Sequence, residues 1–234
     1  MSRFGNALDK GIDILEVLEA SEQPLSFTDL RNRVDIPQAS FARYLKVLVQ
    51  RGYVRQESGG GYILGWRAVQ LGLAGLSRSP LPGTVRPHLE FITETAEESA
   101  EFALFEGVDF IFLDRAECPR SVVLKARPGS RFGITGNTAI GMIALSFGWK
   151  GKDALCTEES MMRIRKEGFA WKLQNSNEVY RGAAPLFNHT GACVGCIVIA
   201  APAFRVKNKE KNLFKRILKK EAEKISVKLG CTEK

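Results

Sequence analysis

Apolar residues recur every three or four positions through the first third of the chain, which is the period of an amphipathic helix. Residues 7–20 are predicted to form a first helix of this kind. Its predicted buried stripe consists of Leu8, Ile12, Leu15 and Leu18. Residues 66–76 are predicted to form another apolar-faced helix, and the Pro- and Gly-containing residues 77–83 then break the pattern. We place a domain boundary at that break.

Two helices joined by a tight turn are predicted between residues 26 and 50. Ser26 is a good N-cap, and Asp29 three positions later gives a near capping box for the first of them. The second is entered through Pro37, because a missing N–H costs nothing at the first helical position. Its predicted buried stripe consists of Phe41, Leu45, Leu48 and Val49.

A glycine-tipped hairpin is predicted directly after the second helix, which ends at Gly52. Its strands are residues 53–55 and 62–64, and its tip is Ser58-Gly59-Gly60-Gly61. Helix, turn, helix and hairpin in this order are the signature of a winged helix-turn-helix, whose second helix enters the major groove of DNA. The alternative is a small helical subdomain whose polar face is only solvated.

Charge favours DNA binding. Residues 1–35 hold 4 Lys/Arg against 7 Asp/Glu, whereas residues 36–79 hold 6 against 1, so the positive charge begins where the second helix begins. Arg43 lies at the centre of the face opposite the buried stripe. We expect Arg43 to read a base edge, and Lys46 and the wing residue Arg55 to contact phosphates. The predicted DNA-binding residues are Gln38, Ser40, Arg43, Lys46 and Arg55.

Helices and strands alternate through the rest of the chain, and a predicted antiparallel hairpin indicates an α+β second domain. The predicted helices are residues 84–100, 137–147 and 158–168, and the predicted strands are residues 101–105, 109–114, 122–126, 169–173, 179–187 and 193–200. Residues 205–234 hold 11 Lys/Arg against 4 Asp/Glu and are predicted to form an amphipathic helix. Its lysines are expected to be solvated, with contact to DNA or a membrane surface as the alternative. Its predicted buried stripe consists of Leu213, Ile217, Ile225 and Leu229.

Composition narrows the class of protein. A chain of 234 residues with 44% hydrophobic residues, 26% charged residues and a net charge of +8 is globular and favours an anionic partner. No apolar run approaches the ~18 residues of a membrane span, and no signal sequence is visible, so we expect a cytoplasmic protein without membrane contact. Five scattered cysteines do not suggest a disulfide framework. Cys193 and Cys196 lie in a predicted strand that would direct them to opposite faces, so we expect no metal site or redox pair.

An enzyme is the competing class, and the sequence gives it little support. A hydrolase needs a nucleophile beside an oriented general base, yet there is no G-x-S-x-G and neither of the two histidines lies in a recognisable motif. The glycine-rich residues 129–137 lack the G-x-x-x-x-G-K-[ST] pattern of a nucleotide-binding loop. We therefore expect no catalytic residues and no cofactor.

The ordered motifs resemble those of IclR-type bacterial transcriptional regulators over nearly the whole chain. The helix-turn-helix run resembles the DNA-binding domain of that family, and GSRFGITGNTAIGMIAL followed by GAAPLFNHTGACVGCIVIAAPAFRV resembles its effector domain. The resemblance implies a winged helix-turn-helix domain over 1–65, a linker helix and hinge over 66–82, and a GAF-like α/β domain over 83–234 with a curved antiparallel sheet. It also implies a homodimer or tetramer, a palindromic double-stranded DNA operator and a small-molecule effector.

The chain departs from the family pattern at several effector-domain positions. Gly141-Met142 replaces the usual Gly-Lys, and Trp171-Lys172 replaces the usual acidic residues. Arg181 is the nearest equivalent of a common cysteine, and Ala200 or Ala201 stands for a common serine. The fold inference survives these changes, whereas the family's polar effector-binding set largely does not.

The predicted effector site therefore rests on the helix that starts near Asn137. The start of a helix presents unpaired N–H groups and a partial positive charge, which suit a carboxylate. Asn137 or Thr138 would cap this helix, and Lys172 and Arg181 would strengthen the preference for an anion if they face inward. The predicted effector-binding residues are Asn137, Thr138, Ala139 and Arg181. The alternative is that Asn137 is only a cap and both cations are solvated.

Four apolar residues, Phe102, Leu104, Phe112 and Phe132, could line a pocket but are expected to be core. The sequence thus predicts a DNA-binding transcriptional regulator, expected to be a repressor, that a small organic anion controls. The alternative is an effector-free regulator or a protein-interaction adaptor that kept the fold and lost the ligand pocket.

Overall fold

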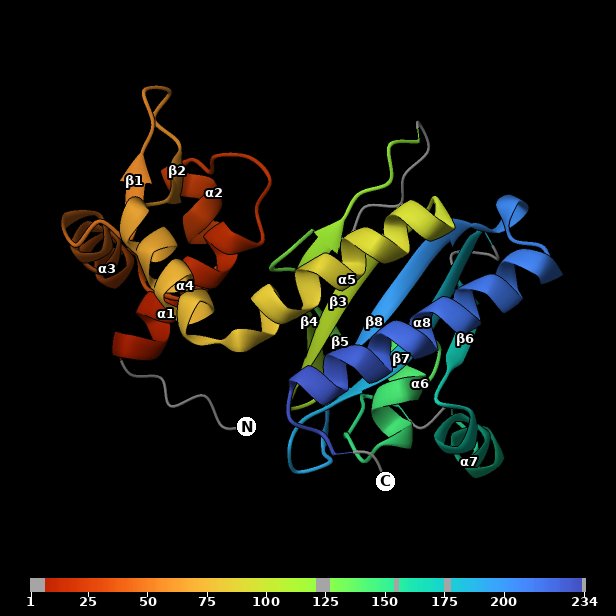
Figure 1. Cartoon of the computed structure of the whole chain (residues 1–234). Helices are drawn as coiled ribbons and strands as arrows, with labels where there is room; N and C mark the ends of the chain where they lie inside the picture. The colour runs from red at the N-terminus through yellow and green to blue at the C-terminus, as the bar shows by residue number, and fades with distance from the viewer. Residues whose placement is uncertain (1–6, 121–126, 154–155, 175–177, 233–234) are drawn as a thin grey trace. The chain divides into compact units, whose positions relative to one another are not determined.

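The computed structural model describes residues 7–120, 127–153, 156–174 and 178–232. The chain divides between Ser79 and Pro80 into two compact units. Figure 1 shows a helical first unit with a small hairpin, and a second unit in which helices cover a sheet. The predicted fold class is confirmed: a winged helix-turn-helix precedes an α+β unit with a curved antiparallel sheet.

From residue 7 onward, the first unit contains four helices and a two-stranded wing. Its elements are α1 (Ala7–Glu19), α2 (Phe27–Asn32), α3 (Gln38–Gln50), β1 (Val54–Gln56), β2 (Tyr62–Leu64) and α4 (Trp66–Arg78). β1 and β2 pair antiparallel with Arg55 opposite Ile63. One small core joins α1, α2, α3 and the wing: Ile14, Leu18, Leu25, Leu30, Ile36, Phe41, Leu45 and Val54.

The buried stripe of α1 differs from the predicted one. Ile14 is fully buried, whereas Leu8 and Ile12 are 71% and 44% exposed. α1 carries two apolar lines, and its packing against α2 and α3 buries only the line through Ile14 and Leu18. In α3, Phe41 and Leu45 are buried as predicted, but Val49 is exposed.

Two details of the turn region also differ from the prediction. Ser26 caps α2 as predicted, accepting a 3.1 Å hydrogen bond from the Asp29 N–H. The Asp29 carboxylate, however, accepts the Ser26 hydroxyl at 2.6 Å. Pro37 is the N-cap of α3 instead of its first helical residue, so the helix begins one residue later at Gln38.

In its described residues, the second unit is a six-stranded antiparallel sheet covered by helices on both faces. Its elements are α5 (Pro80–Ala96), β3 (Ser99–Glu106), β4 (Asp109–Ala116), β5 (Arg131–Gly133), α6 (Ala139–Ser146), α7 (Glu158–Glu167), β6 (Ala170–Gln174), β7 (Val179–Phe187), β8 (Cys193–Pro202), the 3₁₀ turn η1 (Ala203–Arg205) and α8 (Asn208–Lys228). The strand order is β5-β4-β3-β8-β7-β6.

Each face of the sheet has its own apolar core. On the α5/α8 face, Ile197 and Ile199 of β8 pack in one cluster with Leu89 of α5 and Phe214 of α8. On the α6/α7 face, a cluster that includes Cys196 and Val198 of β8 also contains Ile140 and Ile143 of α6 and Ile164 of α7. Because side chains alternate along a strand, each residue of the central strands belongs to one face or the other.

The break between the units is shorter than predicted. α4 continues to Arg78 and α5 already begins at Pro80, so only Ser79 separates the two helices. α5 ends at Ala96 instead of residue 100, because Glu97 adopts a positive φ of 51° and Ser99 begins β3. The predicted strand 122–126 lies outside the described residues.

The terminal helix α8 buries more than its predicted stripe. Ile217 and Ile225 are buried as predicted, Leu213 and Leu229 are only partly buried, and Phe214 and Leu218 complete the contact with the sheet. The predicted line followed a single row of residues, whereas packing across both α5 and β7 buries a wider face of the helix.

The two thiols of the CxxC segment share a face, which corrects the prediction that they point to opposite faces. Leu186 pairs with Gly195 and Phe187 pairs with Cys193, so Val194 is an extra residue in β8. A bulge of this kind shifts the alternation by one position. Cys193 and Cys196 therefore both lie in the α6/α7 core, where burial raises the pKa of the Cys193 thiol to about 12.

Within the described ranges, no helix is long and apolar enough to cross a membrane. The same residues contain no group of three or more His, Cys, Asp or Glu side chains placed to hold a metal ion.

A buried carboxylate joins α5 to α8. Glu221 is 2% exposed; it lies 2.5 Å from His88 Nδ1 of α5 and accepts a 2.7 Å hydrogen bond from Lys224. Burial alone would raise the pKa of Glu221, but the hydrogen bonds from Lys224 and His88 outweigh it and lower that pKa.

Glu221→Gln is expected to lower the free energy of unfolding at pH 7 by about 2 kcal/mol, the value of hydrogen bonds to a charged group. A carboxylate with a lowered folded-state pKa stabilises the fold above the unfolded-state pKa, which is about 4.3. That stabilisation is lost as pH falls through the lower folded-state pKa, so the difference between variant and wild type should shrink in acid. Urea unfolding at a series of pH values measures it, with Glu223→Gln as the exposed control on the same helix. Equal losses for both variants at pH 7 would contradict the expectation.

Candidate functional site

α3 presents one face to the core and the other to solvent. Phe41 and Leu45 anchor it, with the Phe41 ring edge-on to Phe27 of α2 at a centroid distance of 5.1 Å. The opposite face contains exposed Gln38, Arg43 and Lys46, whereas Ser40 is half-buried. Three of the four predicted DNA-contacting side chains of α3, those of Gln38, Arg43 and Lys46, are therefore exposed to solvent.

The two cationic residues of this face, Arg43 and Lys46, differ in their contacts. The Arg43 guanidinium lies 5.3 Å from the centre of the neighbouring Tyr44 ring. This stacking keeps the charge exposed while restricting the side chain. Lys46, one turn further along, forms no ion pair with a described residue. The exposed Val47 beside Lys46 lines an apolar groove between α1 and α3.

Arg55 of the wing lies next to Glu57 and Trp66. Arg55 Nη2 lies 3.3 Å from Glu57 Oε1, and the guanidinium is 6.0 Å from the Trp66 ring centre. Both groups of the ion pair are more than a third exposed, so the pair is weak and a phosphate can replace Glu57 as the partner of Arg55.

The start of α6 is capped by Thr138. Its hydroxyl accepts a 2.9 Å hydrogen bond from the Gly141 N–H, whereas Asn137 is exposed and Ala139 is fully buried. The preceding Gly136 N–H donates to the Asp153 carboxylate at 2.9 Å. The loop also approaches the helix closely, since a Cβ on Gly141 would lie 1.9 Å from the Thr135 carbonyl oxygen. Only glycine fits there, which accounts for Gly141 within the glycine-rich motif.

Arg181 and Lys172 are cross-strand neighbours on β7 and β6. Arg181 is two residues from Ala183, which belongs to the α6/α7 core, so it faces the side of the sheet that α6 covers. Its side chain is 16% exposed, and its guanidinium lies 5.6 Å from the Phe112 ring centre. Arg181 therefore faces inward and is not a solvated surface cation; Lys172 beside it is half-buried.

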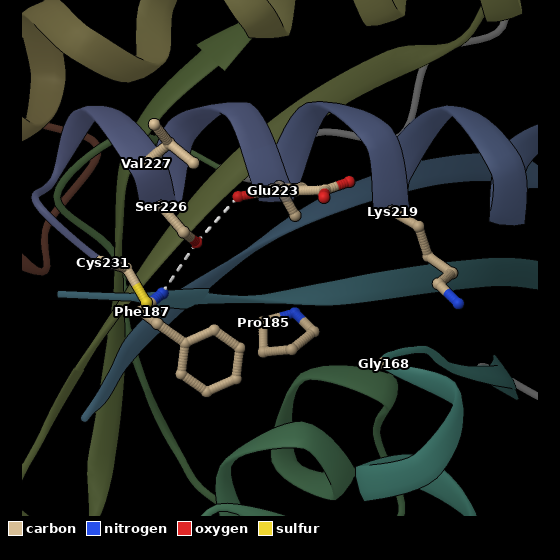
Figure 2. Close-up of a pocket in the computed structure, with 9 residues that line it drawn as sticks. Gly168, Pro185, Phe187, Lys219, Glu223, Ser226, Val227 and Cys231 are labelled. Carbon is tan, nitrogen blue, oxygen red and sulfur yellow. Dashed lines mark hydrogen bonds between the residues drawn. The ribbon is translucent and has the colours of Figure 1, made fainter. Parts of the chain in front are cut away.

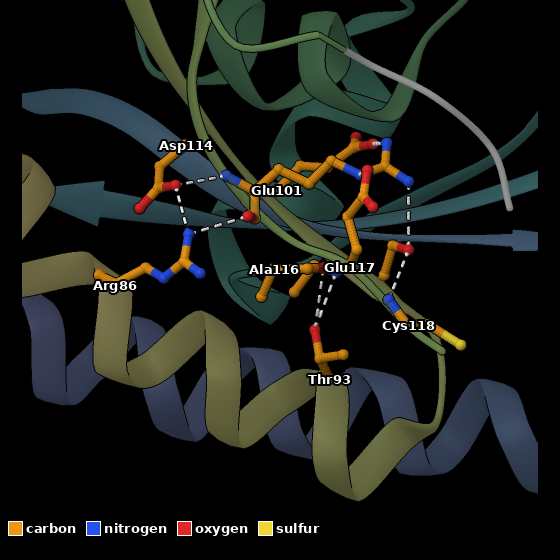
Figure 3. A network of polar contacts seen from close by, with 10 residues as sticks. Arg86, Thr93, Glu101, Asp114, Ala116, Glu117 and Cys118 are labelled. Atoms are coloured by element: carbon orange, nitrogen blue, oxygen red, sulfur yellow. Dashed lines mark hydrogen bonds and ion pairs between the residues drawn. The ribbon is translucent and has the colours of Figure 1, made fainter. Parts of the chain in front are cut away.

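A buried ion network adjoins Arg181. Glu101 of β3 is fully buried, with one carboxylate oxygen 3.0 Å from Arg115 Nη1 and the other 3.6 Å from Arg181 Nη1. Arg115 also donates to Ser99 Oγ at 3.2 Å and lies 3.5 Å from Glu117. Figure 3 shows the part of this network that lies on and next to β3 and β4, including Glu101 and Glu117. Burial raises the pKa of Glu101, and Arg181 and Arg115 oppose that rise.

Sequence reasoning missed Glu101 and Arg115. The available signal was a charged residue at the start of one predicted strand, Glu101, and another directly after the next predicted strand, Arg115. Such residues are rarely fully buried unless they are paired.

The four apolar residues considered for a pocket do not share one surface. Phe102 and Leu104 pack in the α5/α8 core, and Phe112 packs in the α6/α7 core. Phe132 is 50% exposed, so it is not core as expected; its ring centre lies 5.9 Å from that of Phe112. Phe112 and Phe132 thus form an aromatic surface next to Arg181 on the α6/α7 face of the sheet.

A separate cavity of about 500 Å³ lies between α8 and the end of β7 (Figure 2). It is lined by Gly168, Pro185, Phe187, Lys219, Ala222, Glu223, Ser226, Val227 and Cys231. Ser226 accepts the Phe187 N–H at 3.0 Å and donates to the Ala222 carbonyl at 2.8 Å, so its hydroxyl is satisfied within the chain. This cavity does not include the predicted effector-binding residues.

A winged helix-turn-helix unit followed by an α/β unit defines a class of two-part DNA-binding regulators. Family models place the chain within it. The IclR helix-turn-helix domain matches residues 7–58, and the C-terminal domain of the bacterial transcriptional regulator IclR matches residues 150–227. The chain belongs to the IclR family of transcriptional regulators, and its first unit is the helix-turn-helix domain of that family.

Relatives of known type match most of the chain. The HTH-type transcriptional regulator BhcR of Paracoccus denitrificans is 26% identical over 223 residues, covering 86% of this chain and 79% of that protein. The HTH-type transcriptional repressor AllR of Salmonella typhi is 24% identical over 246 residues, covering 96% and 90%. The fold matches the crystal structure of an IclR homolog complexed with 4-hydroxybenzoate from Microbacterium hydrocarbonoxydans, with a TM-score of 0.81 at 18% identity over 96% of this chain and 99% of that one.

Proposed function

We propose that the protein is a sequence-specific repressor that binds a palindromic operator as a dimer or larger homo-oligomer, and that a small organic carboxylate controls its affinity for that operator. The main support for this proposal is the exposed cationic face of α3, whose opposite face is buried in the core. The chain also belongs to a family of transcriptional regulators. AllR, a relative over nearly the whole chain, is a repressor.

Base readout is assigned to Arg43 and the start of α3. An arginine that meets guanine in a bidentate contact contributes discrimination between bases, whereas a cation on a phosphate contributes affinity for any sequence. Gln38 and Ser40 lie on the first turn of α3, nearest the base edges in a helix that enters the major groove through its N-terminus. Lys46 and Arg55 take the phosphate role.

Arg43→Ala is expected to lower the ratio of operator affinity to random-DNA affinity by an amount equivalent to about 1–3 kcal/mol. Lys46→Ala and Arg55→Ala should weaken binding to both DNAs alike and reduce the salt dependence. Fluorescence anisotropy measures this with a genomic fragment retained by the wild type and a scrambled duplex of equal length. Lys209→Ala, in the second unit, is the control. An unchanged ratio for Arg43→Ala would assign base readout to another face.

Dimerisation is supported by the exposed apolar surface of the first unit. α4 has no buried residue, and its Leu71, Leu73 and Leu76 are 55%, 60% and 42% exposed. A helix of 13 residues is marginal in water without packing. A second apolar surface, a groove of about 460 Å³ between α1 and α3, includes the exposed Leu8 and Ile12. A second copy of the chain would cover both surfaces, as expected for large exposed apolar patches.

The wild type is therefore expected to be at least a dimer by light scattering at micromolar concentration. Leu73→Glu should shift it towards the monomer and weaken operator binding, because a charge on the covered face opposes association. Gln70→Glu adds the same charge to the same helix at a polar position and is the control. A monomeric wild type would rule out this part of the proposal.

The effector role rests on the cations of the second unit. Arg181 faces the side of the sheet that α6 covers, and we assign the effector carboxylate to Arg181 and the first turn of α6, residues 137–139. The adjoining Phe112 and half-exposed Phe132 suit a ligand with an aromatic ring. The 4-hydroxybenzoate complex of the Microbacterium homolog is consistent with this class of ligand.

Benzoate or 4-hydroxybenzoate is expected to raise the melting temperature and to change operator affinity, since a regulatory ligand must bind the two functional conformations unequally. Arg181→Ala should abolish both effects. Benzamide, which lacks the charge, is the ligand control, and Lys209→Ala is the protein control. If no carboxylate in a thermal-shift screen moved either quantity while the wild type still bound its operator, the protein would be an effector-free regulator. Failure to retain any genomic fragment would favour an adaptor.

A further inference from the structure

Glu101 already occupies the position of an anion beside Arg181. It lies on β3, opposite Val198 of the neighbouring strand β8, and Arg181 lies opposite Ala200 on the other side of that strand. The small Ala200 side chain leaves room for Arg181 to reach across β8. The carboxylate of Glu101 therefore sits between Arg115 from β4 and Arg181 from β7.

The two halves of this contact are unequal. Glu101 Oε1 accepts a 3.0 Å hydrogen bond from Arg115, which Ser99 also holds in place. Glu101 Oε2 is 3.6 Å from Arg181 Nη1, and neither this oxygen nor the buried Arg181 Nε has a hydrogen-bond partner among the described residues. The Arg115 contact is a full hydrogen-bonded ion pair, whereas the Arg181 contact is loose and can be exchanged.

The charged groups around Glu101 decide what happens on exchange. Arg115 and Arg181 face it directly, Lys172 on β6 stands opposite Arg181, and Glu117 lies beside Arg115 on the exposed side. Cys196 on β8 is buried and its thiol pKa is raised well above the ordinary value, so it stays neutral. A second carboxylate at Arg181 would therefore place two like charges together in a site with low solvent access.

We infer that Glu101 is an internal competing ligand for Arg181: an organic carboxylate replaces it there, and Glu101 takes up one proton from solvent while it stays hydrogen-bonded to Arg115. The inference rests on the proposed effector site and specifies its selectivity. Burial already disfavours the charged form of Glu101, and removal of Arg181 as its partner disfavours that form further. Anions that bind weakly cannot displace Glu101.

The consequence is a carboxylate affinity coupled to pH. Binding that takes up one proton becomes stronger by up to about tenfold for each pH unit of acidification. The carboxylate affinity depends on pH between two values: the Glu101 pKa without ligand, which is raised above its ordinary value, and the still higher Glu101 pKa with ligand bound. The ligand itself must remain ionised, so the useful range lies above the pKa of the carboxylic acid.

The experiment is calorimetric titration of the full chain with benzoate and 4-hydroxybenzoate at pH 5.5, 6.5 and 7.5. Two buffers of different ionisation enthalpy give the number of protons taken up. We expect uptake of up to about one proton per bound ligand and a dissociation constant that rises with pH. Glu101→Gln should bind at least about tenfold tighter at pH 7.5 and lose both the proton uptake and the pH dependence. Benzamide is the uncharged ligand control.

The outcomes separate the inference from the function on which it rests. Carboxylate binding to the wild type without proton uptake overturns the inference and leaves the effector site standing. Binding to Glu101→Gln but not to the wild type supports the inference, because the internal carboxylate then wins the competition. No binding to either protein overturns both. Should Glu101→Gln fail to fold by circular dichroism, the two-buffer measurement on the wild type still decides the question.

Discussion

A charged carboxylate can be fully buried in a sheet only when cations are buried with it, and this constraint organises the second unit. Glu101 lies on β3. The arginines that balance its charge come from opposite sides, Arg115 from β4 and Arg181 from β7. The Glu101 contacts thus span four of the six strands, from β4 to β7. A sequence that keeps Glu101 must also keep Arg115 and Arg181, and it needs a small residue such as Ala200 between them. Within the described parts of the chain, the Arg181 Nε atom has no hydrogen-bond partner.

The first unit follows a different constraint, the small size of its core. Eight buried apolar residues fix α1, α2, α3 and the wing, and this is enough to hold the solvent face of α3 in place. It is not enough to cover the apolar surface of α1 and α4. Leu8, Leu71 and Leu73 remain exposed in this unit. Association of two copies, as proposed above, would cover them and would match the two-fold symmetry of a palindromic DNA site.

The periodic parts of the sequence allowed most of the fold to be predicted. The α3 helix, the wing and the β3–β4 hairpin follow from spacing and turn residues, because local pattern decides them. The choice between two apolar lines on α1 could not be predicted, since it depends on packing against α2 and α3. Cys193 and Cys196 lie on the same face of the sheet because of a bulge at Val194, and no local sequence motif predicts that bulge.

The candidate sites were less predictable for the same reason. Exposure of Arg43 and Lys46 follows from helix geometry alone, so the sequence sufficed. The inward orientation of Arg181 follows from its position on β7, but its contact with Glu101 joins residues 80 positions apart through an intervening strand. Long-range pairing of this kind is visible only once the strand order is known, and Glu101 and Arg115 were accordingly missed.

We propose that carboxylate binding and operator binding are coupled. Linkage requires that operator DNA change the carboxylate affinity by the same factor as the carboxylate changes operator affinity. The most direct test is the dissociation constant of 4-hydroxybenzoate, measured by calorimetry with the protein free and then saturated with operator duplex. We expect at least about a fivefold difference between the two dissociation constants, the lower end of typical allosteric coupling. Equal dissociation constants, with both ligands bound at once, would contradict it.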